Sequence, residues 1–158
     1  MPKVHALSIT LALLLAALLA APSSALAHCE VPCGIYGDHN RFADMREDIA
    51  TIEKAMKEIA SLSAAKDKNY NQLVRWINTK EMHASKLQET VWQYFLTQRV
   101  KPVPMKDPAY ATYQQMLEQL HHLSVYAMKA KQRIDLGVIK KLNALVDEFE
   151  STYMPKKK

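Results

Sequence analysis

The stretch FADMREDIATIEKAMKEI, residues 42–59, places an apolar side chain at every third or fourth position. These positions are Phe42, Met45, Ile49, Ile52, Met56 and Ile59. Because an α-helix turns once in 3.6 residues, steps of three and four keep all six side chains on one face. The remaining positions are mostly charged or small. The stretch therefore predicts a helix that buries one apolar face against neighbouring helices, as in bundles and coiled coils.

Three further helices are predicted on the C-terminal side of this stretch. A polar turn at 66–69 precedes a second helix over about 70–97, which ends before three prolines between residues 102 and 108. A third helix is predicted over about 108–128 and a fourth over about 133–153. Their apolar faces comprise Leu73, Ile77, Ala84, Leu87, Val91 and Tyr94 in the second, Tyr113, Met116, Leu117, Leu120 and Ala127 in the third, and Val138, Leu142, Leu145, Val146 and Phe149 in the fourth.

Composition agrees with a helical protein, since only three of the 158 residues are glycine. Four amphipathic helices with short connections predict an all-α protein whose residues 38–158 form an antiparallel four-helix bundle.

The net charge is +5, and the C-terminal Lys156–Lys158 supplies much of the excess. No basic stripe is interleaved with aromatic residues, so nucleic acid is not an expected partner. The sequence also lacks a nucleotide-binding glycine loop and a nucleophile triad.

Residues 1–27 have the three parts of a secretory signal peptide. A short head with one lysine precedes the apolar run 6–21, and Ala25-Leu26-Ala27 matches the cleavage pattern. The apolar run is shorter than the stretch of about 20 residues that a membrane-spanning helix needs. We therefore expect signal peptidase or another maturation protease to cut before His28. The mature protein would then be exported, periplasmic or extracellular, without stable membrane association. An uncleaved anchor and a leader removed in the cytoplasm are the alternatives.

The residues His28-Cys29-Glu30-Val31-Pro32-Cys33 contain both cysteines of the chain. Cleavage before His28 would place a free amine and an imidazole beside the amide nitrogen and thiol of Cys29. The proline and the glycine on either side of Cys33 favour a turn that brings back the second thiol. Such nitrogen and sulfur donors suit nickel(II) or copper(II), and not calcium or magnesium. We therefore predict a metal-binding hook over residues 28–37.

Two other readings fit the same cysteines. Thiols in an exported protein commonly pair. In one reading, a disulfide therefore joins Cys29 to Cys33, and the protein is a helical interaction protein without a metal. Alternatively, the same hook would belong to an exported, non-enzymatic helical bundle that binds nickel or copper without turnover.

The nine residues HCEVPCGIY, 28–36, resemble the nickel hook of nickel-containing superoxide dismutases, His-Cys-x-x-Pro-Cys-Gly-x-Tyr, at every fixed position. The resemblance implies an enzyme with a nickel ion that converts superoxide to dioxygen and hydrogen peroxide. It implies His28 as the amine and axial imidazole ligand, Cys29 as amide nitrogen and thiolate ligand, and Cys33 as the second thiolate. Tyr36 matches a tyrosine that orders solvent and restricts access near the open axial face of the metal. The family forms four-helix bundles assembled as homohexamers, so a homohexamer is expected here.

Some positions depart from the family pattern. Glu30 stands where the family often has aspartate, and it is a candidate for contact with the ligands. In some members a glutamate and an arginine support the axial histidine. No glutamate aligns cleanly with the first, although Asp44 and Glu47 are nearby, and the arginine position falls on His83. His83 is therefore a second candidate partner of the ligands.

The remaining histidines after residue 27, His39, His121 and His122, are expected on the surface. Dismutation requires a metal that alternately oxidises and reduces superoxide. Anionic thiolate and amide donors make nickel easier to oxidise. The expected reaction therefore cycles between Ni(II) and Ni(III) at the processed N-terminus.

Overall fold

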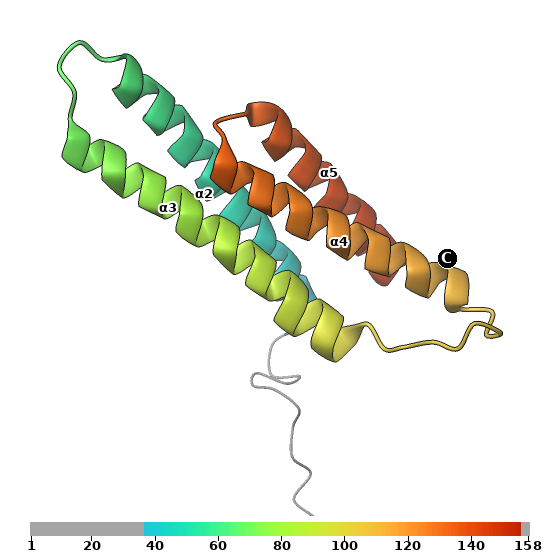
Figure 1. Ribbon diagram of the computed structural model, residues 1–158. Coiled ribbons are helices and arrows are strands. Elements are labelled where there is room, and N and C mark those ends of the chain that lie inside the picture. The colour runs from blue at the N-terminus through green and yellow to red at the C-terminus, as the bar shows by residue number, and fades with distance from the viewer. Residues whose placement is uncertain (1–36, 156–158) are drawn as a thin grey trace, which may run out of the picture.

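The computed structural model describes residues 37–155, and every regular element in this range is helical. Helix α2 spans Asp38–Ala64, α3 Tyr70–Glu89, α4 Tyr110–Gln132 and α5 Leu136–Tyr153, and a π-helix, η1, continues α3 over Thr90–Arg99. Successive helices run in opposite directions, and α2 and α4 each pack against both α3 and α5 (Figure 1). The all-α class is thus confirmed over this range, while residues 28–36 of the predicted hook lie outside it. Across residues 37–155, no helix is apolar over enough of its length to cross a membrane.

The predicted apolar faces build most of the core. All six apolar residues of the 42–59 stretch are at most 4 % exposed, as are all five predicted for the last helix. On α4, Leu120 and Ala127 are buried, while the other three predicted positions are half-buried against the core. Phe42, Phe95 and Phe149 meet near the start of α2, with ring centroids 4.9 to 5.6 Å apart. Each such buried side chain contributes roughly 1.5–3 kcal/mol relative to exposure, so this end of the bundle is firmly packed.

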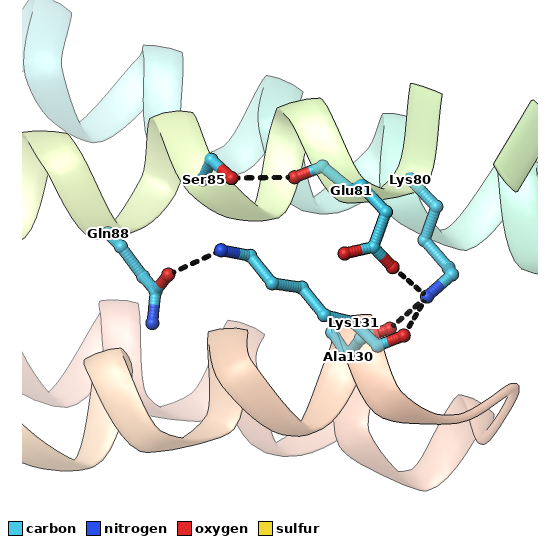
Figure 2. A network of polar contacts seen from close by, with 6 residues as sticks. All are labelled: Lys80, Glu81, Ser85, Gln88, Ala130 and Lys131. Carbon is cyan, nitrogen blue, oxygen red and sulfur yellow. Dashed lines mark hydrogen bonds and ion pairs between the residues drawn. The ribbon is translucent and has the colours of Figure 1, made fainter. Parts of the chain in front are cut away.

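Lys80 joins α3 to the C-terminal end of α4. Its side chain is 5 % exposed, and its ammonium donates to the backbone carbonyl oxygens of Ala130, at 2.8 Å, and of Lys131 (Figure 2). Glu81 pairs with the same nitrogen at 2.9 Å, and the Lys131 ammonium donates to Gln88 on α3 at 2.8 Å. The last carbonyls of a helix lack intrahelical partners and attract positive charge. The buried ammonium is therefore compensated, and α4 ends level with Lys80.

The first turns of α3 extend past this end of α4 (Figure 1). Ile77 lies on this overhanging part and is 38 % exposed, and Leu73 is half-buried. The prediction that Ile77 faces the core is therefore wrong. Its periodic position matches that of Ala84 and Leu87, but it precedes Lys80, the residue beside which α4 ends.

The helix boundaries differ from the predicted ones by a few residues. α4 begins at Tyr110 and continues to Gln132, beyond the predicted end at Met128. α5 begins at Leu136 because the Asp135 side chain caps it, accepting a hydrogen bond from the Gly137 amide at 2.8 Å.

Ile52→Ala and Ile77→Ala remove the same atoms from a buried and an exposed position, which are 0 % and 38 % exposed. We expect Ile52→Ala to lower the free energy of unfolding by about 2–5 kcal/mol, because it leaves a cavity in the core. Ile77→Ala should change it by about 0.5 kcal/mol or less, as surface substitutions do. Urea unfolding followed by circular dichroism measures both values. Equal losses would contradict the overhang of α3.

Candidate functional site

Of the predicted site residues, only His83 lies in the part of the chain that the structure describes. His28, Cys29, Glu30, Cys33 and Tyr36 lie outside the described residues. Gly37 follows Tyr36 directly, so the start of α2 marks where the hook joins the bundle. Within residues 37–155, no group of three or more histidine, cysteine, aspartate or glutamate side chains could hold a metal ion. The candidate metal ligands therefore all lie in the predicted hook, outside the described residues.

The Asp38 carboxylate, in the first turn of α2, is held from two other helices. It accepts hydrogen bonds from the Tyr94 hydroxyl at 2.6 Å, from the Arg99 guanidinium at 2.7 Å and from the Tyr153 hydroxyl at 3.1 Å. Arg99 Nε also donates to the Tyr153 hydroxyl oxygen at 3.2 Å. We call these four residues the Asp38 clamp. It ties the start of α2 to η1 and to the last turn of α5.

The charges of the Asp38 clamp favour an ionised carboxylate. Burial by itself raises the pKa of Asp38, but the hydrogen bonds from Arg99, Tyr94 and Tyr153 and the charge of Arg99 outweigh it, so the pKa lies below its ordinary value. Burial and the hydrogen bond to Asp38 raise the pKa of Tyr94 to about 12. At neutral pH, Asp38 is therefore an anion and Tyr94 a protonated donor.

The π-helix η1 is what brings two clamp residues to one carboxylate. Its backbone bonds span five residues, as in the 2.8 Å bond from the Val100 amide to the Phe95 carbonyl oxygen. Residues five apart in an α-helix lie about 140° apart around the axis, which would point Tyr94 and Arg99 in different directions. In η1 both reach Asp38. π-Helical turns occur frequently at functional sites.

A groove of about 430 Å³ lies between α2 and the continuous helix formed by α3 and η1. We call it the α2–α3 groove. Its lining mixes carboxylates, cations, hydroxyls and amides: Arg41, Asp44, Glu47, Asp48, His83, Lys86, Glu89, Thr90, Gln93, Tyr94 and Gln98. Because Tyr94 both lines this groove and contacts Asp38, the groove extends to the place where the hook joins the bundle.

His83 lies in the groove and contacts Asp48 on α2. Its Nδ1 is 2.7 Å from Asp48 Oδ1, and the two side chains are 17 % and 11 % exposed. Burial raises the pKa of the Asp48 carboxyl above its ordinary value, although the hydrogen bond and charge of His83 oppose this effect. A carboxylate that holds one ring nitrogen fixes the orientation of an imidazole. The second nitrogen, Nε2, is then the one that can meet a further partner.

Gln98 is a buried polar residue in the lining of the groove. The residue is 7 % exposed, and its side-chain carbonyl oxygen accepts no hydrogen bond from the residues between Gly37 and Pro155. Buried polar atoms in native proteins nearly always have a partner. A donor from outside the described residues would satisfy this oxygen.

The acidic residues near the position of the family's supporting glutamate differ in their contacts. Asp44 forms an ion pair with Arg41 at 3.0 Å, and Asp48, not Asp44, contacts His83. Asp48 was not identified from the sequence as a partner of His83. Its position between Met45 and Ile52, at the edge of the apolar face, was a signal that it would lie close to a neighbouring helix. The histidines His39, His121 and His122 are exposed, as predicted.

The family model of the nickel-containing superoxide dismutases matches residues 23–157. This range includes the predicted hook and all four helices. No match was found among curated proteins, and none among solved structures.

The family match favours one of the three readings of the N-terminal cysteines. It indicates an enzyme that acts on superoxide with nickel as its cofactor, and not a metal-free stapled protein or a carrier without activity. Since the match spans most of the sequence, the chain belongs to the family of nickel-containing superoxide dismutases.

Proposed function

We propose that this superoxide dismutase holds its nickel with His28, Cys29 and Cys33 after removal of residues 1–27. One observation carries the proposal: both thiols of the chain lie in residues 28–33, and residues 37–155 contain no alternative cluster of metal ligands. The donors would be the amine and imidazole of His28, the amide nitrogen and thiolate of Cys29, and the thiolate of Cys33. Nitrogen and sulfur donors of this kind suit nickel.

Cleavage before His28 is part of this proposal, because the α-amine exists only in the processed chain. In the precursor the same nitrogen is an amide to Ala27. A free α-amine, with an ordinary pKa near 8, gives up its proton at modest cost. Nickel in such a donor set supplies a one-electron couple, Ni(II)/Ni(III), that is able to oxidise and reduce superoxide in turn.

We further propose that the hook docks in the α2–α3 groove. Nine residues, 28–36, span at most about 30 Å when extended. Asp48 lies eleven residues beyond Gly37 on α2, about 16 Å along the helix axis, so the whole groove is within reach. The unsatisfied oxygen of Gln98 provides an acceptor for a hook amide.

Within this arrangement, we propose that His83 contacts the nickel ligands. Asp48 engages its Nδ1, so a bond to the His28 imidazole would use Nε2. Contacts of this kind orient a metal ligand and tune its basicity. Glu30 lies beside Cys29 in the hook and is proposed as a second such partner. Tyr36, next to the first residue of the bundle, is proposed to order solvent and limit access to the metal.

Assembly and location complete the proposal. A homohexamer is implied by the family resemblance, and an apolar pocket of about 470 Å³ between η1 and α4 offers a surface for subunit contact. Trp92 and Met128, which line it, are 50 % and 42 % exposed. Exposed apolar patches of this kind often mark association sites. The leader over residues 1–27 supports export to the periplasm or the exterior of the cell.

Cys29→Ser and Cys33→Ser test the thiolate assignment. Serine is a harder and far less acidic donor, so each variant should lose nickel and essentially all dismutase activity. The helical content and melting temperature should stay near those of the wild type, because the hook precedes the bundle. Nickel content by mass spectrometry and superoxide consumption by stopped flow give the answer. Activity within about tenfold of the wild type in either variant would refute the assignment.

Gln98→Leu and Gln119→Leu test the docking of the hook. Both residues are buried, and both have a side-chain carbonyl oxygen that accepts no hydrogen bond between residues 37 and 155, but only Gln98 lines the groove. We expect Gln98→Leu to release nickel about tenfold faster, as when a residue supporting a metal ligand is lost. Gln119→Leu should release it at the wild-type rate. Identical rates in the two variants would argue against docking at Gln98.

A further inference from the structure

Among residues 37–155, no side chain caps the start of α2. Gly37 occupies the N-cap position and offers no side chain to the first-turn amides. Asp38 is the only acidic residue in the first turn. Its carboxylate faces Tyr94, Arg99 and Tyr153, and not the amides of its own helix. The contacts that hold the Asp38 side chain are therefore tertiary.

This contact is partly shielded from solvent on the Asp38 side. The Asp38 side chain is 18 % exposed and the Arg99 side chain 36 %. Below it, Tyr153 packs on Phe42, Phe95 and Phe149 with ring centroids 5.5 to 6.1 Å apart. A charge-assisted hydrogen bond on such a rigid base is short and directional. The carboxylate position is consequently set by the packed end of the bundle.

We propose that Asp38 is a positioning residue for the nickel site: the Asp38 clamp fixes the point and direction in which residues 28–36 leave the bundle. The inference rests on the proposed function, in which those residues carry the ligands. A chain end frays unless it is tied down, and a functional site tolerates only about 0.5 Å of displacement. The hook is attached covalently at one end only, two residues before Asp38. The clamp supplies the missing constraint at that attachment.

The π-helix η1 contributes two of the four residues of the Asp38 clamp. Tyr94 and Arg99 reach Asp38 together because η1 is wound with a five-residue repeat. η1 also contributes Gln98 and Tyr94 to the groove. One irregular segment thus sets both the attachment point of the hook and part of its docking surface.

The test compares Asp38→Asn, Arg99→Gln and Tyr153→Phe with Arg46→Gln. Arg46 is a matched control, since it also ties α2 to another helix through carboxylates, at 2.7 Å from Asp147 and 2.5 Å from Glu150. Arg99, Tyr153 and Arg46 do not line the groove. Two quantities are measured: hydrogen–deuterium exchange of residues 38–45 in nickel-free protein, and the rate of nickel release to a chelator from loaded, matured protein.

We expect the three clamp variants to exchange faster at residues 38–45 and to release nickel about tenfold faster or more. Arg46→Gln should match the wild type in nickel release. Clamp variants that exchange at residues 38–45 as the wild type does, or that release nickel as Arg46→Gln does, overturn the inference. Its failure is distinguishable from that of the proposed function: if Cys33→Ser binds nickel as the wild type does, the ligand assignment fails. Exchange in the nickel-free protein still reports whether the clamp holds α2.

Discussion

Burial of the apolar face of α2 is the constraint on which the rest of the structure depends. Burial of the six side chains from Phe42 to Ile59 fixes the rotation of α2 against its neighbours. That rotation also places the polar residues beside this face. Asp38, four residues before Phe42, points to η1 and α5, and Asp48, next to Ile49, points to His83. Core packing and the surroundings of the proposed nickel site therefore share one helical register.

The sequence predicted the elements that depend on local pattern and missed those that depend on partners. The 3.6-residue period was sufficient for α2 and α5, whose predicted apolar residues are all buried. It failed at Ile77 because the length of α4, not the period of α3, decides whether that residue is covered. Neither η1 nor the clamp residues Tyr94, Arg99 and Tyr153 have a local signature. Their roles arise from contacts between residues more than fifty positions apart.

The candidate site divides into a chemical part and a positional part. The donors that suit nickel are concentrated in six residues, 28–33, which were predicted as ligands from their types, their spacing, the predicted cut and the family resemblance. Only His83 of the predicted supporting residues belongs to the described bundle, where Asp48 orients it. The orphan oxygen of Gln98 and the Asp38 clamp became visible only with the structure. A short motif can specify ligands, whereas their placement requires a folded scaffold.

The central claim is that processing creates the nickel site by exposing the amine of His28. The most direct measurement is the nickel bound per chain by protein that begins at His28, compared with protein that carries one additional alanine before it. The account predicts that the extended chain folds normally but binds little nickel. His28, Cys29 and Cys33 are all present in it, but the backbone nitrogen of His28 is an amide and not a free amine. Equal nickel content and equal dismutase activity in the two proteins would contradict it.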